Sequence, residues 1–471
     1  MGGWRQRGRK ARYVNQGDLL VNRDGVHARK CRRAGRAGVR APIVARRDRN
    51  GFGAKGAQEG GDVRSESLEG KPAAVSRLGG TKQAGEIRER WSWVEPTVWT
   101  DRMLTALEEG VKGGKWYSLM DKVSALANLR SAWRKVRASG GAPGVDHQTI
   151  EMFERQREEN LEKLSRTLRE GSYRPQAIRR RWIPKPGSRE KRPLGIPTVR
   201  DRVAETALLH VLGPIFEKEF APQSYGFRPK RGCKDALRRV DHLLKRGQTW
   251  VVDVDIKSYF DTIPHEGLMK RVEERVADGR VLELLRAYLR QSVMETAKDW
   301  SPEEGTPQGA VISPLLANIY LNPLDQWMSR REEGMVRYAD DFVLLCESQA
   351  KAEGTLEQVR RWMNEAGLTL HPEKTRIVDA TKPGGFDFLG YHFERGMKWP
   401  RRRSLAKMKD LIRAKTKRNN GHRLKVIISG VNRTMVGWFG YFKHSHRTTF
   451  PNLDGWVRMR LRSILRKRHH R

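Results

Sequence analysis

The sequence predicts an α+β fold rather than a doubly wound parallel sheet. Short apolar runs that suit strands alternate with helical segments, but they follow no regular βαβ rhythm. The run TWVVDVDI at 249–256 is rich in valine and predicts a strand. The run MVRYADDFVLLC at 335–346 predicts two strands joined by a tight turn that contains Asp340 and Asp341. Together these observations predict a mixed core with at least one antiparallel hairpin.

The first half of the chain is predicted to be mainly helical. Segment 119–138 spaces Leu, Val and Trp side chains as one helix face, and GGAPGVD at 140–146 follows it as a loop. The other elements expected before residue 249 are a helical stretch at 150–169, a strand–turn–strand at 179–196, and helices at 201–220 and 233–245.

The second half alternates more evenly between strands and helices. We expect a helix at 315–328, then the hairpin at 335–346, and then an amphipathic helix that Gly367 ends. Short apolar stretches at 368–370 and 386–393 predict further strands, and from about residue 400 the chain becomes basic and helical. We find no internal repeat.

The charge of the chain is large and uneven. Its 471 residues carry a net charge of +39, of which residues 1–60 contribute +12 and residues 401–471 contribute +19. A near-neutral body with basic ends indicates a polyanionic partner, most simply nucleic acid. The plain alternative, a solvated basic surface, accounts poorly for such an uneven distribution.

Cysteine usage and hydropathy limit the compartment. Three cysteines without a CxxC pair argue against a disulfide framework or zinc ribbon and favour a reducing compartment. The sequence contains no apolar run of about 18 residues, which is the length that would predict a membrane span. Residues 1–90 are expected to form a basic, disordered extension, with an over-long translated leader or an organelle transit peptide as alternatives. A reducing compartment favours a cytoplasmic protein over an organellar one.

Aspartates gather at two predicted strand ends. Asp253 and Asp255 occupy alternate positions of one strand and therefore share a face, and Asp340 and Asp341 sit at the hairpin. An Asp pair alone is common in surface turns. If the two segments pair in one sheet, however, Asp255 can approach Asp340. Clustered carboxylates are costly unless cations neutralise them, and two Mg²⁺ ions would support in-line phosphoryl transfer.

An ordered set of motifs gives these aspartates a context. DIKSYFD, GTPQGAVISPLLANIYLN (305–322), YADD, LTLHPEKT (368–375) and FLGY follow one another, after IPKPGSREKRPLGIPTVRDRV (183–203) and SYGFRPKRG (224–232). This order resembles reverse transcriptases, and more closely the group II intron reverse transcriptase/maturase family. The resemblance implies a right-hand polymerase, with fingers and an antiparallel palm sheet followed by a helical thumb.

The resemblance also implies roles for individual residues. The metal ligands would be three aspartates assisted by a main-chain carbonyl: Asp255, Asp340, Asp341 and Ile256. Phe260 would exclude a ribose 2′-hydroxyl, although a packed core Phe is the alternative. Gln308 and Gly309 would contact the incoming nucleotide, and Lys185 with Arg192 would clamp its triphosphate, with Lys191 able to replace Arg192. Lys374 would protonate the pyrophosphate leaving group, or simply be an exposed lysine.

The basic C-terminal segment resembles the maturase-specific domain of the family. Aromatic residues lie among its Arg and Lys residues, a mixture common on RNA-binding surfaces and equally suited to a helix core; they include Trp438, Phe439, Tyr441, Phe442 and Trp456. His444, His446, His469 and His470 lack Cys or carboxylate neighbours at ligand spacing, which disfavours a metal site. We expect fingers and palm over 115–395 and the thumb/maturase domain over 396–471. The sequence shows no CxxC-bearing endonuclease module, so we do not expect self-sufficient second-strand cleavage.

These inferences predict an RNA-directed DNA polymerase encoded by a group II intron, which also promotes splicing and retromobility of that intron. Its expected cofactor is Mg²⁺ as two ions, with Mn²⁺ as an alternative. Its expected partners are intron RNA as template, a DNA or RNA primer, dNTPs and a DNA target site, and a homodimer is left open. The alternatives are an RNA-binding splicing cofactor with little polymerase activity and an RNA-dependent RNA polymerase, which Phe260 disfavours.

Overall fold

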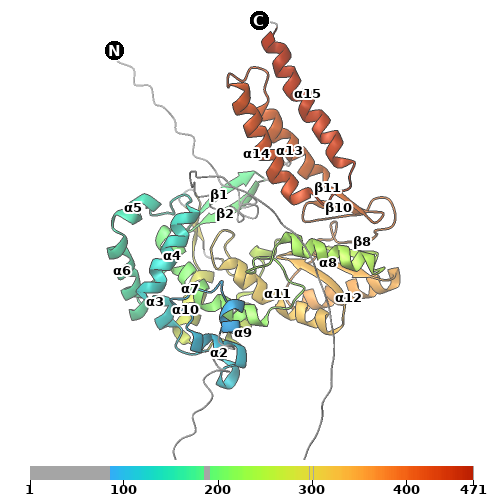
Figure 1. Cartoon of the computed structure of the whole chain (residues 1–471). Helices are drawn as coiled ribbons and strands as arrows, with labels where there is room; N and C mark the ends of the chain where they lie inside the picture. The colour runs from blue at the N-terminus through green and yellow to red at the C-terminus, as the bar shows by residue number, and fades with distance from the viewer. Residues whose placement is uncertain (1–84, 185–190, 296–297, 301, 470–471) are drawn as a thin grey trace, which may run out of the picture. The chain divides into compact units, whose positions relative to one another are not determined.

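The computed structural model describes residues 85–184, 191–295, 298–300 and 302–469 (Figure 1). Most of the predicted basic extension, residues 1–84, lies outside the described residues, but residues 85–90 are helical. The side chains of Trp91 and Trp99 are buried in the largest core, and Trp99 Nε1 donates to the carbonyl of His210 at 2.9 Å. The folded region therefore begins upstream of residue 115, where the sequence pattern placed its start.

The N-terminal helices pack around one long buried helix. The single helix predicted over 119–138 is interrupted at Ala125, whose ψ of 128° is not helical, and the stretch at 150–169 is interrupted at Gln156. Helix α7 (Val199–Glu219) is buried along most of its length, and the buried positions include the polar residues Asp201, Glu205 and His210. The surrounding elements are α2 (Asp101–Glu109), η1 (Lys112–Gly114), α3 (Met120–Ser124), α4 (Leu126–Ser139), α5 (Ile150–Arg155) and α6 (Arg157–Glu170).

A four-stranded sheet contains the predicted strand–turn–strand. Strands β1 (Ile178–Pro184) and β2 (Lys191–Ile196) pair antiparallel, and β1 also pairs parallel with β4 (Val293–Glu295). Strand β5 (Lys298–Trp300) completes the order β2-β1-β4-β5. The turn between β1 and β2 lies outside the described residues.

A second four-stranded sheet is antiparallel throughout and has the order β6-β7-β3-β8. It joins the predicted hairpin to the predicted strand at 249–256. Strand β8 was not predicted, because a four-residue strand carries too little pattern. The strands are β3 (Trp250–Asp255), β6 (Gly334–Tyr338), β7 (Asp341–Cys346) and β8 (Arg376–Asp379).

Helices cover both faces of this antiparallel sheet. Alternation along β3 and β7 sends Val251 and Val343 into a core that they share with α8 (Cys233–Lys245). Val252 and Phe342 enter the main core together with α12 (Gln349–Glu365). The remaining elements of this region are η2 (Tyr259–Asp261), α9 (His265–Glu273), α10 (Gly279–Leu289) and α11 (Ser313–Arg330).

The C-terminal region combines a small sheet and three helices with a core of their own. The strand predicted over 386–393 is in fact two strands joined at Leu389 and Gly390, which both have positive φ. Helices α13, α14 and α15 run side by side (Figure 1) around Met408, Ile412 and Ile464. The bounds are β9 (Phe386–Phe388), β10 (Tyr391–Glu394), β11 (Met397–Pro400), α13 (Arg402–Lys415), α14 (Leu424–Phe442) and α15 (Thr449–His469). Among the described helices, none combines the length and the apolar character that crossing a bilayer requires.

Candidate active site

The antiparallel sheet brings the predicted aspartates together. Its register places Asp255 of β3 directly opposite Asp341 of β7, and Asp253 opposite Val343. Asp253 and Asp255 share the parity of Val251, and Asp341 shares that of Val343, so all three lie on the face that carries α8. The prediction that the two segments pair in one sheet is confirmed.

The hairpin turn is displaced by one residue from its predicted place. Tyr338 pairs with Asp341, so the two turn residues are Ala339 and Asp340, and Asp341 is the first residue of β7. Ala339 has a φ of 61°, a conformation that L-residues rarely adopt and that two-residue hairpins require. Asp340 therefore projects from the turn, whereas Asp341 projects from the strand beside it.

A glycine from a distant segment packs against this turn. Gly226 belongs to SYGFRPKRG, and an added Cβ there would lie 2.9 Å from the carbonyl carbon of Tyr338 and closer still to the amide nitrogen of Ala339. The amide of Tyr225 donates to the carbonyl of Arg337 at 2.9 Å, which fixes the approach. The motif thus serves as a backbone support for the hairpin.

Crowding raises the pKa of several of these carboxyls. Burial raises the pKa of Asp340, with repulsion from Asp255 as a second cause. Burial and then repulsion from Asp253, Asp340 and Asp255 raise the pKa of Asp341 to about 7. The side chain of Asp341 keeps an exposed surface, so burial can contribute only part of this rise in pKa. Repulsion from the neighbouring carboxylates contributes the rest. Burial likewise raises the pKa of Asp253 to about 6, against the attraction of Arg376.

These carboxylates do not form a closed metal cage. Within the ranges that the structure describes, no three His, Cys, Asp or Glu side chains converge as ligands of one ion. The facing pair of Asp255 and Asp341 fits Mg²⁺, which proteins usually hold through one or two carboxylates while waters and substrate phosphates supply the other ligands. The repulsion that raises the pKa of Asp341 is the electrostatic condition that a divalent cation would relieve.

Lys374 is the present counter-ion of Asp255. Its ammonium lies 2.9 Å from Asp255 Oδ2, and both side chains are well exposed. The neighbouring backbone is fixed by a bridge in which Lys257 N donates to Thr369 O and His371 N donates to Asp255 O. Neither bond uses the carbonyl of Ile256, which was predicted as a metal ligand.

The predicted nucleotide-contacting residues lie on two segments that are bonded together. The amide of Thr306 donates to the carbonyl of Phe260 at 2.6 Å, and Gln308 Nε2 donates to Asp261 Oδ2 at 3.0 Å. Phe260 is partly buried, and its ring meets that of Tyr259 edge to face at 5.6 Å. Both the gate interpretation and the core interpretation of Phe260 therefore have a structural basis, because the ring packs on the core while keeping an accessible surface.

The same loop is joined to β2. Gly195 N donates to the carbonyl of Gln308 at 2.6 Å, and Gly309 has a φ of 117°. A Cβ on Gly309 would lie 3.2 Å from the carbonyl carbon of Gly195 and would overlap its oxygen, so only glycine fits. Arg192 lies on β2 opposite Ile183. Lys185 lies outside the described residues, so the predicted triphosphate clamp stays a prediction.

Two family matches account for most of the folded region. Residues 183–393 match the family described as reverse transcriptase (RNA-dependent DNA polymerase), and residues 405–471 match the group II intron, maturase-specific domain. The Escherichia coli protein YkfC is 36% identical over 308 residues, which cover 57% of this chain and 80% of YkfC. The chain belongs to the group II intron reverse transcriptase/maturase family. The resemblance drawn from the motifs, the α+β polymerase class and the reverse transcriptase assignment are confirmed.

Other similar proteins are matched over a smaller share of their own length. The group II intron-encoded protein LtrA of Lactococcus lactis is 36% identical over 199 residues, which cover 42% of this chain and only 33% of LtrA. A solved telomerase from Candida albicans aligns at 15% identity with a TM-score of 0.39, over 64% of this chain and 62% of that one. That likeness is too weak to support an argument.

In the maturase-specific domain, most of the aromatic residues pack against a core but stay partly exposed. Phe442 is buried and packs on Tyr391, with ring centroids 5.0 Å apart, whereas Phe439 is half exposed. Lys409 and Arg413 both lie over the ring of Trp456. Core packing and exposed cations therefore coexist here, as both interpretations of the sequence required.

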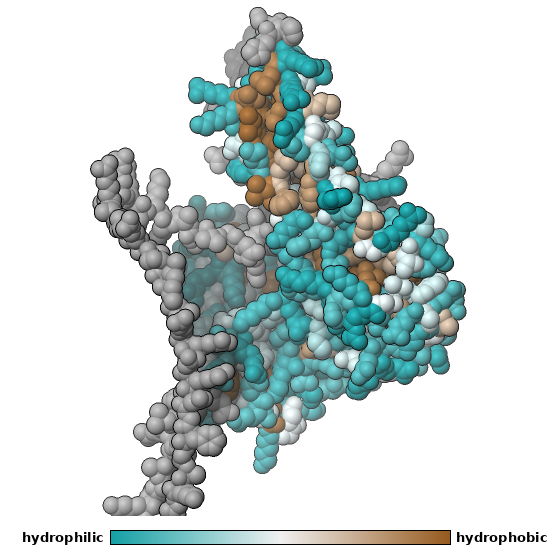
Figure 2. All heavy atoms as spheres, turned by 45° about the vertical axis from the view of Figure 1, so that its right-hand side comes forward, coloured by the Kyte–Doolittle hydropathy of each residue, from teal (hydrophilic) through white to brown (hydrophobic). Residues whose placement is uncertain are grey.

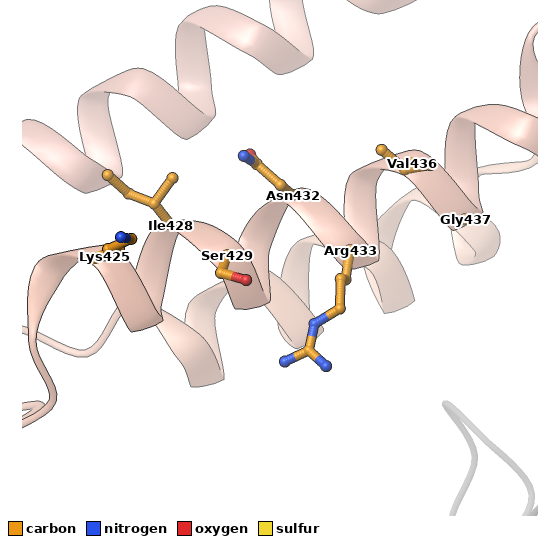
Figure 3. Close-up of a pocket in the computed structure, with 7 residues that line it drawn as sticks. All are labelled: Lys425, Ile428, Ser429, Asn432, Arg433, Val436 and Gly437. Atoms are coloured by element: carbon orange, nitrogen blue, oxygen red, sulfur yellow. The ribbon is translucent and has the colours of Figure 1, made fainter. Parts of the chain in front are cut away.

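Helix α14 carries an open groove on its exposed side (Figure 3). The groove has a volume of about 620 Å³ and is lined by Lys425, Ile428, Ser429, Asn432, Arg433, Val436 and Gly437. Ile428, Asn432 and Val436 follow one line along the helix, and Arg433 extends to the other side (Figure 3). Figure 2 shows apolar atoms gathered on these C-terminal helices, where Val426 and Val436 are more than half exposed.

Sequence reasoning missed several residues that support the site. Arg337, Asp325 and Asn318 are buried beneath the hairpin, and Asp261 holds Gln308. One signal was available for Arg337: it shares the parity of Met335, which faces the main core, so alternation alone indicated a buried arginine.

Proposed function

We propose that this chain is an RNA-directed DNA polymerase encoded by a group II intron, with its reaction centre at Asp255, Asp340 and Asp341. The observation that carries the proposal is the register that sets Asp255 opposite Asp341, with Asp340 on the adjoining turn. Two Mg²⁺ ions held there would activate a primer 3′-hydroxyl and stabilise the developing pyrophosphate. Mn²⁺ has the same preference for oxygen ligands and is the alternative ion.

The carboxylates are suited to this task because they are crowded and yet reachable. Asp255 is paired with Lys374, and that pair is exposed, so a divalent ion can compete for the carboxylate at modest cost. Once released, Lys374 stands beside the reaction centre as the candidate donor of a proton to pyrophosphate. The carbonyl of Ile256, which the adjacent backbone bridge does not use, is the proposed additional ligand.

Phe260, Gln308 and Gly309 form the proposed deoxynucleotide pocket. Phe260 would exclude a 2′-hydroxyl by its bulk, and the bond to Asp261 orients the amide of Gln308. Lys185 together with Arg192 of β2 is the proposed clamp of the triphosphate, with Lys191 as the alternative to Arg192.

The maturase-specific domain is the proposed contact for intron RNA. Its net charge over 401–471 is +19, and the α14 groove offers Lys425 and Arg433 beside apolar side chains. We propose that this contact promotes splicing and, with a DNA target site, retromobility in the bacterial cytoplasm. In the proposed domain order, the polymerase is thus followed by an RNA-binding thumb.

Primer extension tests the polymerase proposal. The full chain is given poly(rA), an oligo(dT) primer, dTTP and Mg²⁺, and Asp340→Ala is compared with the unaltered protein. Extension by the unaltered protein and none by the variant is the expected result. No extension by either protein, together with splicing that Asp340→Ala leaves intact, would instead support the splicing-cofactor alternative.

A further inference from the structure

The hairpin that carries Asp340 and Asp341 rests on a fully buried arginine. Arg337 of β6 has no exposed side-chain surface, and its partner Asp325 of α11 has none either. Arg337 Nε donates to Asp325 Oδ1 at 2.8 Å, and a second guanidinium nitrogen donates to Asp325 Oδ2. The pair is therefore bidentate, which fixes the plane of the guanidinium group.

The third guanidinium nitrogen reaches the catalytic turn. Arg337 Nη1 donates to the carbonyl of Ala339 at 2.8 Å and to Asn318 Oδ1 at 2.9 Å. The carbonyl of Ala339 belongs to the peptide that joins Ala339 to Asp340, so this bond restrains the peptide immediately before the predicted metal ligand. Because Ala339 holds a positive φ, the turn needs such a restraint to keep its conformation.

Asn318 connects the same group to the segment that supports the turn from the other side. Its Nδ2 donates to the carbonyl of Gly226 at 2.8 Å. Gly226 packs against Tyr338 and Ala339, and Arg337 N donates to the carbonyl of Gln223 at 3.0 Å. Helix α11, the turn and the segment around 223–226 are therefore joined through two side chains.

Stability alone does not explain this arrangement. Replacing a buried ion pair by apolar side chains of similar volume is often neutral or stabilising, so a buried pair is a weak source of folding free energy. What an apolar pair cannot supply is a directed bond to the Ala339 carbonyl. The geometry therefore points to a positional role.

We infer that Arg337, Asp325 and Asn318 form a positioning unit, which fixes the turn that presents the Asp340 carboxylate beside Asp255 and Asp341. This inference rests on the proposed function and adds three residues to it. None of the three would touch substrate or metal; they act through the turn. A loosened turn should weaken metal binding and slow the chemical step while leaving the binding of primer–template unchanged.

The test uses Arg337→Lys and Asn318→Ala in the full chain. Arg337→Lys keeps the positive charge but loses the planar guanidinium group that makes the bidentate pair with Asp325. Asn318→Ala removes the hydrogen bonds of Asn318 to Arg337 and Gly226. Loss of groups that orient metal ligands typically costs about 10- to 100-fold in metal affinity or activity. We expect the Mg²⁺ concentration for half-maximal extension to rise by about that factor and kcat to fall, with KM for dTTP and the affinity for primer–template within about twofold.

Asp278→Asn is the matched control. Asp278 is a buried carboxylate that accepts the amides of Leu119 and Met120 at 2.6 and 2.8 Å. Its other oxygen accepts the amides of Arg280 and Val281 at the start of α10, so its hydrogen bonds serve helix ends and not the hairpin. This variant should lower the melting temperature without changing the Mg²⁺ dependence. If Arg337→Lys does not fold, Asn318→Ala decides the question, because it retains the ion pair.

The outcomes separate this inference from the proposed function. If Asp340→Ala extends primers as the unaltered protein does, the proposed reaction centre is wrong. If Asp340→Ala is inactive while Arg337→Lys and Asn318→Ala keep the Mg²⁺ dependence and kcat of the Asp278→Asn control, the positioning unit is wrong and the reaction centre stands.

Discussion

Replacing Gly226 by alanine should displace the turn between β6 and β7 and slow catalysis, although it changes none of the three aspartates. The new Cβ would lie 2.9 Å from the carbonyl carbon of Tyr338, whereas ordinary contact begins near 3.4 Å. The new Cβ meets backbone atoms, which cannot rotate away as a side chain can. The turn would therefore have to move by at least about 0.5 Å at Tyr338, and by more at the amide of Ala339. Misplacement of catalytic groups by about 1 Å can cost about 100-fold in rate, so we expect kcat to fall by about 10- to 100-fold.

The assay is single-turnover primer extension over a range of Mg²⁺ concentrations. Gly354→Ala supplies the control, because Gly354 lies in α12 with ordinary φ and no atom within 4 Å of the added Cβ. That substitution should keep kcat and stabilise the helix by up to about 1 kcal/mol. The reasoning would be refuted if Gly226→Ala kept the kcat and Mg²⁺ dependence of the control.

Three further predictions follow from the same geometry. Phe260→Ala should raise the use of ribonucleotides relative to deoxynucleotides by at least about tenfold, measured as a ratio of kcat/KM values; an unchanged ratio would favour the purely structural view of Phe260. Because the folded-state pKa values of Asp253 and Asp341 are raised to about 6 and about 7, these two carboxyls bind more protons in the folded protein than in the unfolded chain above about pH 4. In EDTA, the stability that these groups contribute should therefore fall as pH rises from about 4 through 7, and the difference in melting temperature between the unaltered protein and Asp341→Asn should show this slope; a flat difference would contradict it. Replacing Lys425 and Arg433 by Gln should weaken RNA binding and reduce the slope of log K against log salt by about 0.7 for each phosphate that the protein no longer neutralises, while an unchanged slope would exclude the α14 groove as an RNA-binding surface.

Alternation was sufficient to predict that Asp253 and Asp255 share one face of their strand. The approach of Asp255 to Asp340 was expected only if the two segments paired, and the observed register places Asp255 opposite Asp341. The turn was misplaced by one residue because Ala339, which carries the positive φ, is a poor turn former by propensity. Tertiary bonds from Arg337 and the close approach of Gly226 hold it there, and neither is a local property of the hairpin.

The supporting shell was harder to predict because its members come from distant segments. Asp325 and Arg337 are 12 residues apart, but Asn318 meets Gly226 across 92 positions, and Gln308 meets Asp261 across 47. No periodicity encodes such pairings. Strand β8 was missed for a related reason, since Arg376–Asp379 becomes a strand only because β3 offers it an edge.

The bond between Gly195 and the carbonyl of Gln308 links two parts of the enzyme that the motifs treat separately. Strand β2 is tied to the loop at 305–309, and that loop is tied to the backbone of Phe260. A rotation of the β1–β2 hairpin would therefore displace the backbone of Phe260 through these two bonds. On the proposed roles of Phe260 in excluding the 2′-hydroxyl and of Arg192 in binding the triphosphate, substitutions along β2 should change sugar selection and triphosphate affinity together.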